Sequence, residues 1–172
     1  MSSDPFRQLI RACAQDAPSW DHLDTRALPV QLPATGEPYG RAPLFRDDEG
    51  EILLVNWRNG MPCAPHDHSA ASGFIFLVSG TLFETHWHFD GHALHEGAQS
   101  SYRAPNIIRI EHDCIHDMRA QDNCVGVHVY LPRISGMRVF DSARRETLRV
   151  SDDCGAWIPT DPRLILSRDR WP

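Results

Sequence analysis

The sequence predicts a mainly β protein, built as a sandwich or barrel of short strands, with short helices at its N-terminus. From about residue 38 to 151, apolar runs of strand length alternate with Gly, Pro, Asn and Asp, a pattern typical of many short strands joined by turns. Residues 4–16 have a different pattern, because apolar side chains recur there at helical spacing behind Pro5, which suits a first helical turn. Together these two observations favour a jelly-roll barrel preceded by a helical segment over residues 4–28.

The individual elements follow from local patterns. A second short helix is predicted over residues 19–28, and Asp90-Gly91 and Ser79-Gly80 are predicted turns between strands. The last stretch, 164–172, is predicted as an edge strand or a tail. The clearest predicted strands are 51–57, 73–79, 81–89, 106–110 and 125–131.

Composition limits the possible functions. A chain of 172 residues fits one domain, which we expect to span residues 1–172 with the barrel at about 38–151. The net charge of -6 and the lack of a basic stripe argue against nucleic acid and anionic membranes as partners. No apolar run approaches the roughly 20 residues of a membrane span, and the first residues lack an apolar signal core, so we expect a cytoplasmic protein. The five cysteines form no CxxC pair and are expected as free thiols.

Histidines carry the strongest functional signal. His66 and His68 are two residues apart, so on an extended segment both side chains can reach one metal ion from the same face. A third ligand must come from elsewhere, and His116 is the preferred candidate, with His112 as a rival. His86, His88, His92 and His95 surround the Asp90-Gly91 turn among polar residues, and we interpret them as a solvated hairpin.

The segment around His66 resembles the first motif of the cupins, a glycine, five residues, HxH and a later glycine, here Gly60 and Gly80. The resemblance implies a cupin jelly-roll barrel. Many cupins have a metal-binding glutamate soon after HxH, whereas residues 69–79 contain no carboxylate. Three neutral imidazoles would leave iron(II), Fe(II), its full charge and open positions, which favours an anionic ligand such as a thiolate.

Three further matches make the chain resemble the cysteine dioxygenase family over residues 38–133. His66-Asp-His68 resembles the family's HDH, Tyr39-Gly-Arg41 its Tyr-x-Arg, and the segment from Gly126 to Pro132 its Ser-x-His-x-Tyr-x-Pro. Trp57 stands where the family commonly has an aromatic residue.

The resemblance implies a role for each matched position. His66, His68 and His116 would hold Fe(II), and Arg41, with Tyr39 in the same motif, would bind the substrate carboxylate through its planar guanidinium. His128 would position the phenol of Tyr130 beside the metal. A small thiol, L-cysteine first, would react with O2 to give a sulfinic acid, as in cysteine catabolism. The resemblance also implies a cis peptide bond between Leu131 and Pro132.

The chain departs from the family pattern in three places. Gly126 replaces the family's serine, so the hydrogen-bond relay to His128 would lack its first member. Gly73 replaces the cysteine that cross-links to the tyrosine in animal enzymes, so no thioether is expected. The segment between His116 and His128 is shorter than the family pattern, which is why His112 stays a rival ligand.

Other functions remain alternatives. A thiol dioxygenase for 3-mercaptopropionate-type substrates is the nearest, and a metal-dependent cupin isomerase or lyase and a non-catalytic ligand-binding cupin are more distant. Arg41 and Tyr130 help to distinguish them, because both facing the metal together would favour a thiol dioxygenase, whereas the other functions gain if neither does. The sequence indicates no oligomeric state.

Overall fold

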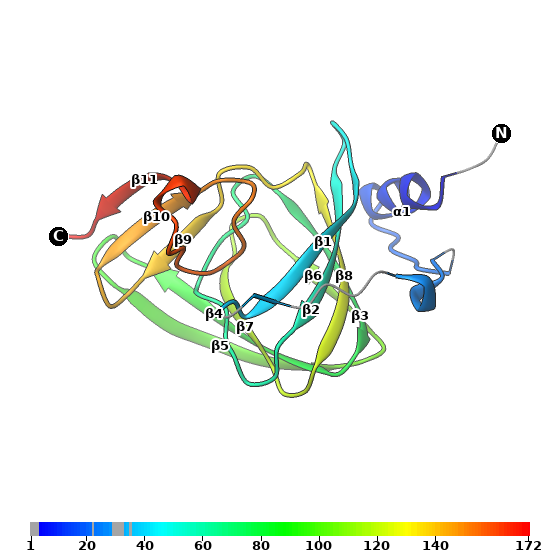
Figure 1. Ribbon diagram of the computed structural model, residues 1–172, viewed down its shortest axis with the longest axis horizontal. Helices are drawn as coiled ribbons and strands as arrows, with labels where there is room; N and C mark the ends of the chain where they lie inside the picture. The colour runs from blue at the N-terminus through cyan, green and yellow to red at the C-terminus, as the bar shows by residue number, and fades with distance from the viewer. Residues whose placement is uncertain (1–3, 22, 29–32, 35) are drawn as a thin grey trace.

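The computed structural model describes residues 4–21, 23–28, 33–34 and 36–172, and their architecture is a barrel of antiparallel sheets (Figure 1). A five-stranded sheet has the order β1-β2-β8-β3-β6, and two three-stranded sheets have the orders β5-β4-β7 and β11-β10-β9. The strands are β1 (Tyr39–Arg46), β2 (Glu51–Trp57), β3 (Ser72–Ser79), β4 (Thr81–Phe89), β5 (Leu94–Arg103), β6 (Asn106–Ile110), β7 (Ile115–Ala120), β8 (Cys124–Leu131), β9 (Arg138–Asp141), β10 (Glu146–Val150) and β11 (Ile165–Arg170). The predicted all-β jelly-roll class is confirmed.

The N-terminal helix α1 (Pro5–Ala14) covers the outer face of the five-stranded sheet (Figure 1). Asp4 caps it by accepting a hydrogen bond from the Phe6 backbone N–H at 3.0 Å. Leu9, Ile10 and Cys13 are buried against the sheet, as their helical spacing predicts.

The second predicted helix is wrong in extent. Among the described residues of 19–28, the structure contains only a 3-10 turn, Thr25–Ala27. Before it, the Ser19 hydroxyl accepts from the Asp21 backbone N–H at 3.3 Å and donates to the Asp21 carboxylate at 2.7 Å. Such local side-chain bonds offer the backbone an alternative to a helix.

The central strands β2, β3 and β8 are buried on both faces, which explains their long apolar runs. Ile52, Phe76 and Val129 pack outward under α1. Alternate residues on the same strands, including His128 and Tyr130, face the interior of the barrel. The strand register pairs Glu51 with Tyr130, so both lie on the interior face.

The C-terminal strands close the side of the barrel away from α1 (Figure 1). Among the strands that the structure describes, β11 pairs with β10 alone, so the edge strand was the correct alternative for the last stretch. The peptide bond between Leu131 and Pro132 is cis, as predicted. None of the helices in the described ranges is long and apolar enough to cross a membrane.

Gly73 of β3 lies directly against the backbone of β8. A Cβ atom added there would lie 1.8 Å from the Val129 carbonyl oxygen, far inside van der Waals contact. The backbone therefore has no room for a cysteine at this position, which agrees with the expectation that no thioether forms.

We predict that Gly73→Ala lowers the free energy of unfolding by about 3 kcal/mol or more, because two paired backbones must move apart. Gly91→Ala is the control, since its Cβ would meet nothing within 4 Å and its φ of +92° costs only about 1 kcal/mol of strain. Urea unfolding monitored by tryptophan fluorescence measures both. Equal losses in the two variants would contradict the close approach.

Candidate functional site

The HDH segment is held between two strands that lie far from it in the sequence. His66 and His116 exchange both backbone hydrogen bonds, each at 2.9 Å, and His66 also bridges Val139 of β9. These are isolated bridges, so the segment is extended without being part of a regular strand. The pairing places the imidazole of β7 beside the two imidazoles of the HDH motif.

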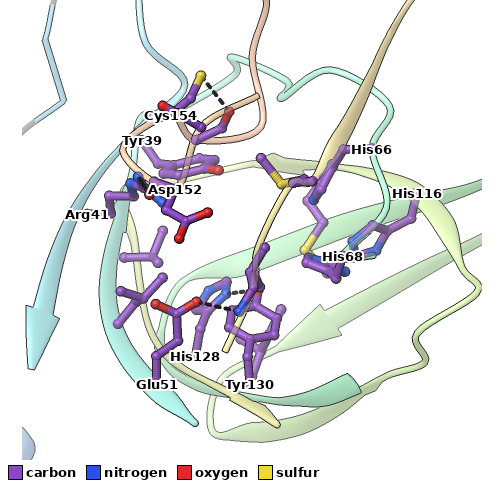
Figure 2. A pocket seen from close by; sticks show the side chains of 18 of the residues that line it. Tyr39, Arg41, Glu51, His66, His68, His116, His128, Tyr130, Asp152 and Cys154 are labelled. Atoms are coloured by element: carbon purple, nitrogen blue, oxygen red, sulfur yellow. Dashed lines mark hydrogen bonds between the residues drawn. The ribbon is translucent and has the colours of Figure 1, made fainter. Parts of the chain in front are cut away.

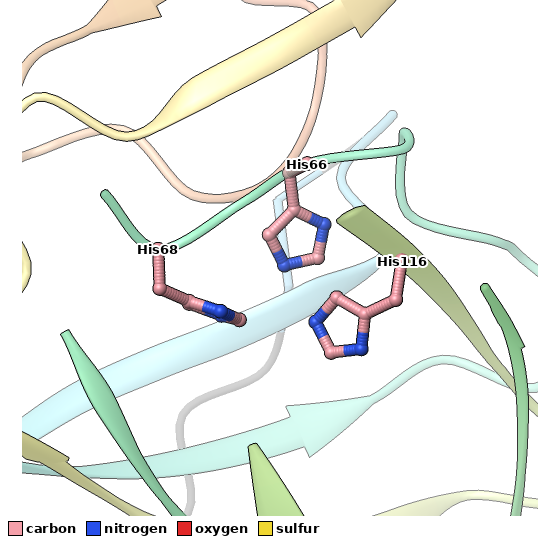
Figure 3. A group of neighbouring side chains, drawn as sticks. All are labelled: His66, His68 and His116. Atoms are coloured by element: carbon pink, nitrogen blue, oxygen red, sulfur yellow. The ribbon is translucent and has the colours of Figure 1, made fainter. Parts of the chain in front are cut away.

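Three imidazoles converge inside the barrel (Figure 3). His66, His68 and His116 are buried and each offers a ring nitrogen within 4.8 Å of the others. Their ring centroids are 4.7–5.1 Å apart. The rival His112 is not part of this group, because its side chain is 55% exposed and lies 3.0 Å from the Asp113 carboxylate.

The free nitrogens of this cluster suit a metal ion. The Nδ1–H of His66 donates to the Ala64 carbonyl at 2.9 Å, which leaves Nε2 as the ring's electron-pair donor. Nε2 of His116 and Nδ1 of His68 are buried and have no hydrogen-bond partner among the described residues. Burial lowers the pKa of His66 and His68 well below 6.5, so both rings are in the neutral form that metals require.

A carboxylate that sequence analysis missed supports the cluster from outside. Glu84 of β4 is 3% exposed and accepts a hydrogen bond from Nδ1–H of His116 at 2.5 Å. The Tyr102 hydroxyl donates to the other oxygen of Glu84 at 2.9 Å, and Nε2 of His86 lies 3.3 Å from it. Burial alone would raise the pKa of the Glu84 carboxyl, but the contacts with His116, Tyr102 and His86 outweigh it and lower that pKa.

The cluster forms one wall of a cavity inside the barrel, and the other residues implied by the family resemblance line the same cavity (Figure 2). Tyr39, Arg41, His128 and Tyr130 all contribute to its walls. Its volume is about 40 Å³. One water needs about 10–15 Å³ on that scale, so the cavity suits a small ligand.

Tyr130 and His128 form a hydrogen-bonded pair in this cavity. The Tyr130 hydroxyl and Nδ1 of His128 are 3.0 Å apart, and the Tyr130 ring stacks on His68 with centroids 4.9 Å apart. Burial raises the pKa of the Tyr130 phenol well above 10, so it stays protonated and can donate a hydrogen bond. Burial, followed by the nearby His116, lowers the pKa of His128 to about 3, so its ring is neutral.

Arg41 and Tyr39 enter the cavity from β1. A guanidinium N–H of Arg41 donates to the Asp152 carbonyl at 2.5 Å, which leaves other N–H groups of its fork for a ligand. The Tyr39 hydroxyl accepts from the Ala156 backbone N–H at 2.6 Å and its ring packs against Trp57. Both side chains therefore anchor the loop after β10 over the cavity.

Several cavity residues carry no motif and were missed by sequence analysis. Asp152 and Cys154 belong to the loop after β10, and Glu51 belongs to β2 (Figure 2). Glu51 is buried but satisfied, because it accepts from the Arg46 guanidinium at 2.7 Å and from the Ile134 backbone N–H at 2.9 Å. Only the folded chain brings these residues to the HDH segment.

Two of the other sequence features have defined positions. The histidine hairpin is largely solvated as predicted, except that His86 turns toward Glu84 and is 45% exposed.

At Gly126, an added Cβ would lie 3.3 Å from Nε2 of His128, an atom with no hydrogen-bond partner in the described part of the chain. The missing serine therefore leaves a real gap in the hydrogen bonding of His128.

Comparisons with known proteins agree with this geometry. The family model described as cysteine dioxygenase type I matches residues 41–143, more than half of the chain. The chain belongs to this family.

Solved structures share the barrel at low sequence identity. A conserved protein with a double-stranded β-helix domain from Klebsiella pneumoniae superposes with a TM-score of 0.54 at 16% identity, covering 67% of this chain and 92% of that one. KdgF from Halomonas sp. has a TM-score of 0.49 at 15% identity, with 60% and 89% covered. A cupin superfamily protein from Desulfitobacterium hafniense has a TM-score of 0.47 at 10% identity, with 61% and 84% covered. The Klebsiella protein supports the double-stranded β-helix fold, and the fold only.

The low pKa of His128 predicts how stability depends on pH. An unfolded histidine gains a proton below pH 6.5, whereas folded His128 gains one only near pH 3. The free energy of unfolding should therefore fall as the pH falls from 6.5 toward 3, by up to about 1.4 kcal/mol per pH unit from this residue.

Urea unfolding of the metal-free protein at pH 7, 6 and 5 measures this slope. His128→Gln lacks the titrating group and should give a shallower slope, whatever its absolute stability. An unchanged slope would show that His128 is not neutral in the folded protein.

Proposed function

We propose that this protein is an iron(II)-dependent thiol dioxygenase that converts a small thiol carboxylic acid, L-cysteine first, to its sulfinic acid. The observation that carries the proposal is one small cavity lined by the three-histidine cluster, by Arg41 and by Tyr130, in a chain of the cysteine dioxygenase type I family. In the net reaction R–SH and O2 give R–SO2H, so both oxygen atoms end on sulfur and no further reductant is needed.

In this proposal His66, His68 and His116 hold the metal. No carboxylate belongs to the cluster among the described residues, so the bound ion would keep its full charge and attract an anionic ligand. When bound, iron(II) would supply the one-electron chemistry that activates dioxygen and would lower the pKa of a coordinated thiol. The neutral imidazoles of His66 and His68 match this role because they need lose no proton when the metal binds.

The protein's own groups would bind and orient the substrate. A carboxylate buried without a partner is costly, and the free N–H groups of Arg41 can meet it in the cavity. The protonated phenol of Tyr130 can donate a hydrogen bond to a polar atom beside the cluster, and His128 fixes its direction. The loop after β10, anchored by Tyr39, covers the cavity and limits the entry of water.

The positions of Arg41 and Tyr130 support a thiol dioxygenase over the other cupin activities. Arg41 and Tyr130 line the same cavity as the histidine cluster. The most obvious alternative base for an isomerase or lyase, Glu51, is occupied by two hydrogen-bond donors.

The metal assignment predicts one iron per chain, bound by three imidazole nitrogens at roughly 2.0–2.2 Å, by analogy with zinc–nitrogen distances. His116→Ala should weaken iron(II) binding by on the order of 100-fold or more, since loss of a ligand costs more than loss of an outer partner. His112→Ala is the matched control and should keep the affinity of the parent. Anaerobic titration with iron(II) measures both, and metal loss in the His112 variant alone would overturn the assignment.

The substrate assignment predicts that Arg41→Ala weakens carboxylate-bearing thiols by on the order of 2–5 kcal/mol in apparent binding, with iron content unchanged. Oxygen uptake is measured against the concentration of cysteine, 3-mercaptopropionate and cysteamine, which lacks the carboxylate. Cysteamine should be a poor substrate of the parent and change little in the variant.

Arg58→Ala is the control for a lost arginine, because Arg58 donates to the carbonyls of Pro33 and Ala34 and does not line the cavity. Cysteine oxidation with unchanged KM and kcat in the Arg41 variant would exclude Arg41 as the carboxylate partner. Lack of oxygen uptake with every thiol, in iron-loaded parent protein, would reject the dioxygenase itself.

A further inference from the structure

The three histidines of the cluster differ in the hydrogen-bond partners of their rings. The backbone carbonyl of Ala64 accepts from His66, whereas the buried carboxylate of Glu84 accepts from His116. Among the described residues, no carboxylate accepts a hydrogen bond from the His68 ring. Within the described chain, His116 is therefore the one member of the cluster hydrogen-bonded to a carboxylate.

We propose that Glu84 is a positioning residue of the metal centre, which fixes the ring of His116 and supplies, through that ring, the negative charge that the ligand set lacks. The inference rests on the metal site of the proposed function and not on its substrate. A carboxylate on the far nitrogen of a ligand imidazole keeps that nitrogen protonated and makes the other one a stronger donor. Nε2 of His116, the other nitrogen, is buried and unpartnered in the described structure, as a ligand atom would be.

Glu84 is itself held from three sides, so its position is determined by the fold. Strand β4 pairs with β7 on one side and with β5 on the other, which places Glu84 between His116 and Tyr102. Its oxygens contact Nδ1 of His116 at 2.5 Å, the Tyr102 hydroxyl at 2.9 Å and Nε2 of His86 at 3.3 Å. A carboxylate that is only 3% exposed needs such partners, because an unpaired buried charge is costly.

The arrangement reconciles the carboxylate-free HDH segment with a centre that holds a divalent cation. In the motif of many cupins a glutamate binds the metal directly. Here the carboxylate is one hydrogen bond removed, so it compensates charge without occupying a position at the metal. A small ligand in the cavity keeps access to the ion.

The test compares metal binding by Glu84→Gln with that of the parent. Glutamine keeps the size and one acceptor oxygen but removes the charge, so the dissociation constant for iron(II) should rise 10–100-fold. The Fe(III)/Fe(II) potential should also rise, because the more highly charged ion loses more stabilisation. Cobalt(II) serves as a spectroscopic probe, and its ligand-field bands should shift in the variant.

Two further variants separate this role from simple destabilisation. Glu146→Gln removes another buried carboxylate, which pairs with Arg168 on β11 and does not line the cavity, and it should leave the metal affinity within twofold of the parent. Tyr102→Phe removes one support of Glu84 but keeps its charge, and it should weaken metal binding less than Glu84→Gln. It also provides the test if Glu84→Gln fails to fold.

The outcomes distinguish the two proposals. Metal affinity, potential and cobalt spectrum all unchanged in Glu84→Gln would overturn the role of Glu84, as would an equal loss in Glu146→Gln. If only Tyr102→Phe can be purified, an unchanged metal affinity in it would overturn the role. A parent protein that binds iron through Glu84-dependent affinity but oxidises no thiol would reject the dioxygenase and leave this inference intact.

Discussion

The structure depends on the paired backbone hydrogen bonds between His66 and His116. The two residues lie fifty positions apart, yet each donates its N–H to the other's carbonyl at 2.9 Å. This pairing inserts the HDH segment between β7 and β9 and closes the barrel at that point. Because it acts on the backbone, it positions the imidazoles before any metal binds.

Along the central strands, side chains that stabilise the fold alternate with side chains that line the cavity. On β8, Val127 and Val129 pack outward beneath α1, while His128 and Tyr130 face the cavity. The apolar outer layer holds the strand in place, so the inner side chains can be polar without loss of the fold. Burial then acts on those groups: it keeps His128 neutral and Tyr130 protonated. The protonation states of His128 and Tyr130 therefore follow from their burial on the interior face of the barrel.

The charged side chains in and beside the cavity are each held by hydrogen-bond partners. Glu51 and Glu84 are both buried carboxylates near the cavity, but each is held by several donors. Arg41 is held by the Asp152 carbonyl and keeps donors for a ligand. The cavity therefore combines the Arg41 guanidinium with the three-histidine cluster, and under the proposed function this combination would suit a small anionic thiol. The loop that supplies Asp152 lies beyond the stretch matched by the family model, so this wall belongs to the chain's own C-terminal part.

The sequence by itself predicted the barrel class and most strands, because strand periodicity is a local pattern. Its resemblance to the cysteine dioxygenase family indicated His66, His68, Arg41, His128 and Tyr130 as candidate site residues. It preferred His116 to His112 as the third histidine from a short motif alone, since the pairing of His116 with His66 and the exposure of His112 appear only in the folded chain. It did not reveal Glu84, Glu51 or Asp152, which carry no motif. Only the tertiary structure decided these, because partner choice depends on strand register and on which face of a sheet is covered, and both are set by contacts between residues far apart in the chain.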